Sequence, residues 1–189
     1  MVFEDYQQKE SVVVVYTGEG KGKTSAGLGL MVRALGRGQK VAFIQFIKSW
    51  ETGERKFIQQ ILPQFGNQLT YHSGGRGFFQ AGELSAKNVT DDEHRQSALE
   101  TFNFALGLAS SGEFNLVVCD EINNALHDGL LGKDDFAKLF DARHERTSLC
   151  LTGRDFPDQF LDKADIVTGM TKVKHHFDDK FLANKGIDY

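Results

Sequence analysis

A glycine-rich run near the start of the chain carries the clearest chemical signal, residues 17–24 (TGEGKGKT). Its final Gly22-Lys23-Thr24 matches the end of the phosphate-binding loop pattern (P-loop, Walker A), Gly-x4-Gly-Lys-Ser/Thr. Thr17 stands at the position of the pattern's first glycine, and Gly18 follows it directly. A strand, a glycine loop, Lys-Thr and a helix in this order predict a binding site for a nucleoside triphosphate.

Each residue type in this run suits an anionic ligand. The backbone N–H groups of Gly18, Gly20 and Gly22 can face phosphate oxygens because no side chain blocks them. Lys23 adds a positive charge, Thr24 can offer an oxygen to Mg²⁺, and the following helix contributes its positive N-terminal end. A dinucleotide-binding fingerprint fits less well, since its third glycine would fall at Lys23.

Two adjacent carboxylates, Asp120 and Glu121, follow an apolar run at residues 116–119 (LVVC). This arrangement resembles a Walker B strand, which supplies acidic groups to the metal of a phosphate loop. The alternative is an acidic helix start, where carboxylates complement the helix dipole. Together with the phosphate loop, the pair favours a Mg²⁺ or Mn²⁺ site made from Thr24, Asp120 and Glu121, and the spacing does not choose between the two carboxylates.

The elements that must position these residues alternate along the chain. Short apolar runs predict strands at residues 12–16, 41–46, 69–72, 115–119, 148–152 and 165–168. Helical spacing and capping signals predict helices at residues 23–37, 51–62 (ended by Pro63), 90–110, 133–143 and 158–163. A glycine-rich stretch at residues 73–89 is long enough to be a lid or a binding loop.

This alternation is typical of a three-layer α/β fold with a mainly parallel sheet and helices on both faces, the P-loop NTPase-like (RecA-like) architecture. Ligands of such sheets bind beyond the carboxyl ends of the strands, so the motifs should converge on that edge. We expect one domain over residues 1–189, with residues 1–11 as a flexible or docking N-terminal segment.

The composition of the chain indicates which partners and locations to expect. The chain has 22 basic and 26 acidic residues, and this net charge of -4 gives no reason to expect a nucleic acid. No apolar run approaches the roughly 20 residues that cross a bilayer, and the N-terminus lacks the pattern of an export signal, so we expect no membrane association and a cytoplasmic location. Cys119 and Cys150 lie in apolar runs and are expected to be buried structural thiols.

Further motifs extend the pattern over most of the chain. They are residues 17–25 (TGEGKGKTS), 33–38 (RALGRG), 41–48 (VAFIQFIK), 75–78 (GRGF), 120–121 (DE), 152–154 (TGR), 164–165 (AD), 172–177 (KVKHHF) and 186–189 (GIDY). This ordered set resembles the CobA/BtuR family of ATP:corrinoid adenosyltransferases over roughly residues 12–189. The most specific part is the pairing of QFIK at 45–48 with the terminal GIDY at 186–189.

The resemblance implies transfer of the 5′-deoxyadenosyl group of ATP to the cobalt(I) of a corrinoid, either cob(I)alamin or a precursor such as cob(I)yrinic acid a,c-diamide. Triphosphate would leave, and the reaction would serve cobalamin biosynthesis or salvage. Because cobalt is the nucleophile, no Ser, Cys or His nucleophile is expected. The resemblance also implies a reductase or flavodoxin as electron donor and a homodimer.

Site residues carried over from the family follow its motifs. The ATP contacts are Gly18, Glu19, Gly20, Lys21, Gly22, Lys23, Thr24, Ser25, Arg33 and Arg154, with Lys23 and Glu121 as the catalytic candidates. Phe78 and Phe79 would meet the corrin, although Gln80 stands where the family commonly has tryptophan. The alternative for the two phenylalanines is that they anchor the loop to the core.

Other interpretations of these residues remain open. Lys21 could be a solvated loop lysine, and Arg154 could form a surface ion pair. His175 and His176 could contact either ligand, or they could be solvated. At the level of the whole protein, the alternatives are a P-loop ATPase or kinase, and a non-catalytic ATP-dependent module that binds a corrinoid or a nucleotide.

Overall fold

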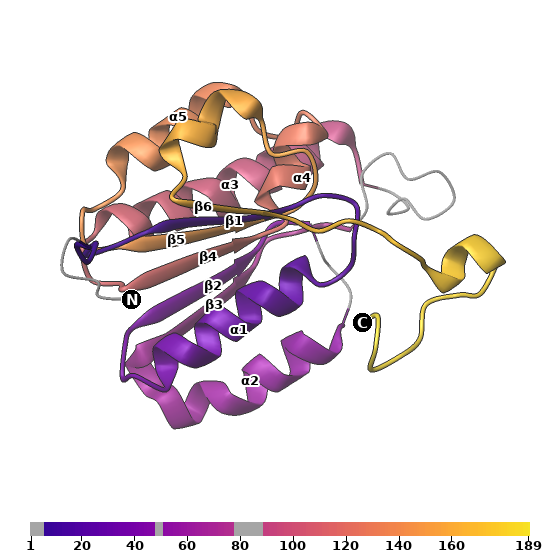
Figure 1. The fold of residues 1–189 in the computed structure, drawn as a ribbon, viewed down its shortest axis with the longest axis horizontal. Helices are drawn as coiled ribbons and strands as arrows, with labels where there is room; N and C mark the ends of the chain where they lie inside the picture. The colour runs from indigo at the N-terminus through magenta and orange to yellow at the C-terminus, as the bar shows by residue number, and fades with distance from the viewer. Residues whose placement is uncertain (1–5, 48–50, 78–88) are drawn as a thin grey trace.

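A parallel sheet forms the centre of the protein. The structure is a computed structural model, and it describes residues 6–47, 51–77 and 89–189. The six strands lie in the order β3-β2-β4-β5-β1-β6, and each neighbouring pair is parallel (Figure 1). They are β1 (Val13–Thr17), β2 (Val41–Gln45), β3 (Leu69–Ser73), β4 (Leu116–Asp120), β5 (Ser148–Thr152) and β6 (Ile166–Gly169). The predicted α/β fold with a mainly parallel sheet is confirmed.

Helices cover both faces of this sheet, as Figure 1 shows. One face carries α1 (Lys23–Leu35) and α2 (Gly53–Phe65), which bury Met31 and Ile58 against β2 and β4. The other carries α3 (Asp91–Ser110), α4 (Ile122–His127) and α5 (Lys133–Ala142), which bury Phe102, Ile122 and Phe136. Three short 3-10 helices complete the described elements: η1 (Gly66–Gln68), η3 (Asp158–Lys163) and η4 (His176–Asp179).

The central strands read as unbroken apolar runs because both of their faces are covered. Every residue of β2 and β4 is buried, and so are the last four of β5. Cys119 and Cys150 lie inside this layer, and burial raises the pKa of both thiols, that of Cys119 to about 12. The prediction of buried structural cysteines is confirmed.

The start of α3 shows how the sequence sets a helix boundary. Thr90 Oγ1 accepts a hydrogen bond from Glu93 N at 3.2 Å, and Glu93 Oε2 accepts one from Thr90 N at 2.8 Å. Two otherwise unpaired N–H groups are satisfied reciprocally, which confirms the capping box expected at Thr90.

Several predicted helices differ from those observed. Helix α2 continues through Pro63 to Phe65, because a proline in the last turn removes only one hydrogen bond before the helix ends anyway. Residues 158–163 form the 3-10 helix η3 after Pro157, with Phe160 N donating to Pro157 O at 3.0 Å. Helix α4 was not predicted, since its residues 122–127 (INNALH) are too few to show a periodic pattern.

Two side chains of the N-terminal segment contact loops between the helices and strands. Lys9 forms an ion pair with Asp165, and the hydroxyl of Ser11 donates to Glu145 O at 2.5 Å. Residues 1–5 lie outside the described chain. Among the helices described, none is long and apolar enough to cross a membrane.

Candidate functional site

The phosphate loop joins β1 to α1. Two of its glycines are required because another part of the backbone packs too closely against them for a side chain to fit. A Cβ at Gly18 would lie 2.6 Å from the carbonyl oxygen of Met170, and one at Gly20 would lie 2.8 Å from it. The Met170 backbone follows β6 and closes on the loop: Gly20 N donates to Met170 O and Met170 N donates to Thr17 O, each at 2.7 Å. Gly18 and Gly22 also have φ of 101° and 106°, a region that favours glycine.

Thr17, which stands at the position of the pattern's first glycine, makes a structural hydrogen bond. Its hydroxyl oxygen accepts a hydrogen bond from Phe156 N at 3.2 Å. The side chain therefore ties the end of β1 to the segment that follows β5, and the loop keeps its turn through Gly18.

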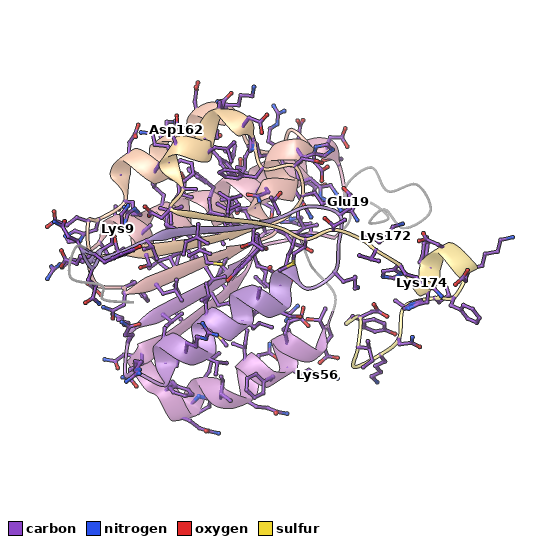
Figure 2. All side chains as sticks on the ribbon, viewed as in Figure 1. Lys9, Glu19, Lys56, Asp162, Lys172 and Lys174 are labelled. Atoms are coloured by element: carbon purple, nitrogen blue, oxygen red, sulfur yellow. The ribbon has the colours of Figure 1, made fainter. Side chains whose placement is uncertain are left out.

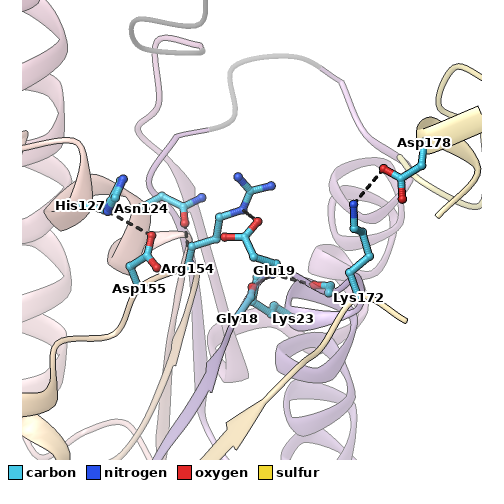
Figure 3. A network of polar contacts seen from close by, with 10 residues as sticks. Gly18, Glu19, Lys23, Asn124, His127, Arg154, Asp155, Lys172 and Asp178 are labelled. Atoms are coloured by element: carbon cyan, nitrogen blue, oxygen red, sulfur yellow. Dashed lines mark hydrogen bonds and ion pairs between the residues drawn. The ribbon is translucent and has the colours of Figure 1, made fainter. Parts of the chain in front are cut away.

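Lys23 occupies the mouth of the loop. Its Nζ donates to the carbonyl oxygens of Gly18 at 2.6 Å and Gly20 at 2.7 Å (Figure 3). Burial lowers the pKa of Lys23, and Arg154 lowers it further, whereas Glu19 and Glu121 act in the opposite direction. The charged residues singled out in the sequence therefore lie close enough to act on one ammonium group.

Asp120 is the centre of a buried hydrogen-bond network. Its carboxylate, at the end of β4, has no exposed surface. One oxygen, Oδ1, accepts from Thr152 Oγ1 at 2.7 Å, and the other, Oδ2, accepts from Gln45 Nε2 at 3.2 Å and Thr24 Oγ1 at 3.3 Å. The network therefore fixes the hydroxyl of Thr24 at the start of α1.

Tyr71 extends this network to β3. Its hydroxyl donates to Gln45 Oε1 at 2.7 Å, so that both ends of the buried Gln45 amide are bonded. Gln45 and Asp120 are partners in the β2–β4 register, which explains why two strand ends place them side by side. Burial raises the pKa of Tyr71, so its hydroxyl keeps its proton and remains a donor.

Glu121 adopts a left-handed backbone conformation with φ of 64°. Its N–H donates to Thr152 Oγ1 at 2.9 Å, and its side chain is half-buried and makes no capping hydrogen bond to α4. A non-glycine residue in this conformation is uncommon and costs free energy, and such residues gather at functional sites. Glu121 is also the N-cap residue of α4, so the acidic helix start considered as an alternative is present, although the Glu121 side chain makes no capping hydrogen bond.

Arg154 reaches the loop from the end of β5. Its Nε lies 3.4 Å from Glu19 Oε2, and both side chains are more than half exposed (Figure 3). Its backbone N–H donates to Asn124 Oδ1 at 2.7 Å. Arg154 thus does form the surface ion pair considered as an alternative, but with a residue of the phosphate loop.

Lys21 is more than half exposed, but it also forms an ion pair. Its Nζ lies 2.9 Å from Asp188 Oδ1 in the terminal Gly-Ile-Asp-Tyr motif, and His176 Nε2 lies 3.6 Å from the other oxygen of that carboxylate. His175 instead accepts a hydrogen bond from Phe177 N at 3.0 Å through Nδ1. Figure 2 shows Glu19 of the loop and Lys172 of the C-terminal segment at the same edge of the sheet.

The structure does not bring Arg33 to the loop. Ten residues along a helix separate it from Lys23, a rise of about 15 Å. Arg33 instead lines a pocket of about 280 Å³ with Arg37 and Arg146, beside Leu116 and Ser148 where β4 and β5 begin. It lies at the opposite edge of the sheet because α1 runs antiparallel to the strands.

The other predicted positions fall into two groups. Ser25 lies in the first turn of α1 and is exposed next to the loop. Phe78 and Phe79 lie outside the described residues, as does Gln80. No group of three or more His, Cys, Asp and Glu side chains arranged for a metal occurs in the described chain.

Sequence reasoning missed the residues that hold the site together. Gln45, Tyr71 and Thr152 were not predicted as site residues, although Gln45 and Thr152 lay within quoted motifs. The available signal was a polar residue at the end of an apolar strand, because parallel strands end at one edge. Asp188 also lay in a motif, but only the fold shows that it reaches Lys21.

Comparisons with known proteins find relatives over nearly the whole chain. The family model described as ATP:corrinoid adenosyltransferase BtuR/CobO/CobP matches residues 9–189. A corrinoid adenosyltransferase of Pseudomonas aeruginosa is 33% identical over 184 residues, covering 97% of this chain and 86% of that protein. One of Escherichia coli is 30% identical over 188 residues, covering 97% and 88%.

A solved structure supports the fold alone. The flagellar accessory protein FlaH of Methanocaldococcus jannaschii superposes with a TM-score of 0.54 at 11% identity, covering 85% of this chain and 71% of that one. The family match extends over nearly the whole sequence and includes both the phosphate loop and the C-terminal motif that contacts it. The chain therefore belongs to the ATP:corrinoid adenosyltransferase family BtuR/CobO/CobP.

Proposed function

We propose that this protein transfers the 5′-deoxyadenosyl group of ATP to the cobalt(I) of a reduced corrinoid, cob(I)alamin or a precursor, and releases triphosphate. The observation that carries the proposal is the loop with Lys23 at its mouth, joined through Thr24 to the buried Asp120, in a chain of this family. The same loop alone would serve any P-loop enzyme.

The bond that breaks is C5′–O of ATP. The cobalt(I) electron pair forms the new bond to C5′, the C5′–O electron pair leaves with triphosphate, and the cobalt becomes formally cobalt(III). All three phosphates depart together, so donors placed around them stabilise the charge that develops on the leaving group. We assign this role to Lys23, Lys21, Arg154 and the backbone N–H groups of the loop other than that of Gly20, which already donates to Met170 O.

The residues beside the loop fit a hard divalent cation, Mg²⁺ or Mn²⁺. Thr24 Oγ1 and the Asp120 carboxylate supply oxygen donors, which such ions prefer, and phosphate oxygens would supply others. Asp120 already accepts hydrogen bonds from Thr152 and Gln45, so Thr24 is the direct ligand in our proposal and Asp120 orients it. The ion, when bound, would neutralise charge on the triphosphate.

The corrinoid side of the site is proposed to begin where β2 and β3 end. Gly74 N donates to Gln45 O at 3.1 Å and Gly77 N donates to Ile47 O at 3.2 Å, so the chain enters residues 78–88 beside the Asp120 network. Phe78 and Phe79 follow directly and would contact the corrin. We further propose a cytoplasmic homodimer that receives electrons from a reductase or a flavodoxin.

Product identification tests this function. The protein is incubated with ATP, Mg²⁺ and chemically reduced cobalamin, and separately with a reduced precursor; we expect the adenosylated corrinoid and triphosphate. Release of orthophosphate or phosphorylation of an acceptor would instead identify an ATPase or kinase. ATP binding without any product from either corrinoid would identify a binding module.

A further inference from the structure

The C-terminal segment returns to the phosphate loop after leaving the sheet. It runs from β6 past η4 and back toward the N-terminal end of α2, so that the last residues lie at the carboxyl edge of the sheet (Figure 1). Beyond the backbone contacts of Met170, an ion pair between Lys21 Nζ and Asp188 Oδ1 at 2.9 Å joins the end of this segment to the loop. The Asp188 side chain is 5% exposed, whereas that of Lys21 is 55% exposed.

Asp188 is held rigidly by its own backbone turn. Its Oδ2 accepts from Asn184 N at 2.8 Å, and its N–H donates to Asn184 O at 2.8 Å. Gly186 N donates to Tyr189 O at 2.8 Å, which closes the same turn. The carboxylate therefore has a fixed direction, and Oδ1 is the oxygen that it presents to the loop.

This geometry has a consequence for Lys21. A lysine ammonium carries three N–H donors, so one bond to Asp188 leaves two for phosphate oxygens. A long lysine side chain loses rotamer freedom when it binds a ligand, and a side chain already fixed loses less. The Asp188 carboxylate can therefore fix the position of the Lys21 ammonium before an anion binds. This requires that the carboxylate and the anion bond to different N–H donors of the ammonium.

We propose that Asp188 is a positioning residue for ATP: its carboxylate holds the Lys21 ammonium over the phosphate loop, ready for the triphosphate. This inference rests on the proposed function only insofar as the loop holds the triphosphate of ATP. It gives the Gly-Ile-Asp-Tyr motif a physical role, because the turn at Asn184 to Tyr189 sets the direction of the carboxylate.

Two other roles for Asp188 lead to different measurements. If the carboxylate competed with the triphosphate for Lys21, its removal would strengthen ATP binding. If it only anchored the C-terminal segment, its removal would act equally whether or not Lys21 is present. A positioning role alone predicts weaker binding that depends on Lys21.

The test measures the Kd of ATP with Mg²⁺ by titration calorimetry, without corrinoid. Asp188→Asn keeps the size of the side chain, and we expect it to raise the Kd about 5- to 10-fold, the range of a coupled pair of contacting residues. Asp188→Glu, which restores a carboxylate, should recover part of this loss. Asp178→Asn is the matched control, since Asp178 pairs with Lys172 at 2.8 Å in the same segment, and it should leave the Kd unchanged.

The decisive comparison uses the Lys21→Ala background. There, Asp188→Asn should have no further effect on the Kd. A Kd that is unchanged or lower in the single variant would overturn the proposal, and so would an equal loss in both backgrounds. Because ATP affinity is measured without corrinoid, a failure of adenosyl transfer would leave this result intact and would count only against the proposed function.

Discussion

Replacing Thr152 by valine should break the site at its most connected point. Thr152 is fully buried at the end of β5, and its hydroxyl both donates to Asp120 Oδ1 at 2.7 Å and accepts from Glu121 N at 2.9 Å. Valine has nearly the same shape, so the change removes two hydrogen bonds without opening a cavity. It leaves a carboxylate oxygen and a backbone N–H without that partner.

The magnitude follows from what is left unpaired. Losing a bond to a charged group and leaving a buried donor unsatisfied each cost about 1–3 kcal/mol, so we expect the free energy of unfolding to fall by about 3 kcal/mol. For a chain of this length, about 2–4 °C of Tm accompanies each kcal/mol, which gives a fall in Tm of roughly 6–12 °C. Because Asp120 orients Thr24, kcat/KM should fall about 10-fold or more, as is usual for the partners of a ligating group.

Thr147, which directly precedes the first residue of the same strand, offers a matched control. It is also fully buried, and its hydroxyl donates to Phe114 O at 2.8 Å, away from the phosphate loop. Thr147→Val should therefore lower stability, measured by urea unfolding, without lowering kcat/KM or ATP affinity. The reasoning is refuted if Thr152→Val loses less than about 1 kcal/mol, or if the two variants affect ATP binding equally.

Three further changes test other parts of the site. Lys23→Ala should weaken ATP binding about 10- to 100-fold in calorimetry because it removes charged donors, and it should also lower the urea midpoint because two hydrogen bonds to loop carbonyls are lost; unchanged affinity would contradict its role. Gly20→Ala should weaken ATP binding because its Cβ would lie 2.8 Å from the Met170 backbone, whereas Gly29→Ala, with nothing within 4 Å, should leave ATP binding unchanged and stabilise α1 by about 0.5–1 kcal/mol. The pKa of Asp188 is lowered to about 2 by the Asn184 N–H and Lys21, so its contribution to stability is complete above pH 3.8 and is lost as the pH falls toward 2. A carboxyl NMR titration with a midpoint at 3.8, the ordinary value for an aspartate, would contradict that arrangement.

The strands were predictable because their physics is local. Runs such as residues 116–119 are apolar throughout, as buried parallel strands must be, and the predicted run ends one residue before β4 does. The capping box at Thr90 and Glu93 was equally local, since its hydrogen bonds join residues three apart. Helix α4 was missed because its six residues, 122–127, give no window for a period.

The acidic pair shows where sequence reasoning stops. Spacing placed Asp120 and Glu121 at a strand end but gave them equal standing. The structure separates them: Asp120 is buried and bonded to Gln45, Thr24 and Thr152, whereas Glu121 is half-buried and has a left-handed backbone conformation. This difference depends on which strands are neighbours in the sheet, and order along the chain does not reveal it.

The same limit applies to charged residues far apart in the sequence. Arg33 shares a helix with Lys23, yet the length of that helix carries it to the opposite edge of the sheet. Asp188 is far from Lys21 along the chain, yet the C-terminal segment brings the two into contact. Distance along a helix could have excluded Arg33 from the loop, whereas no local pattern could have placed Asp188 there.

The most direct test of the central claim follows the phosphates of ATP. With reduced cobalamin, ATP and Mg²⁺, phosphorus NMR should show intact triphosphate that appears in step with adenosylcobalamin, one for one. Thr152→Val and Lys23→Ala should slow both products together. Orthophosphate or pyrophosphate as the primary product, or triphosphate formed without adenosylcobalamin, would contradict the assignment of the loop as the holder of a leaving triphosphate.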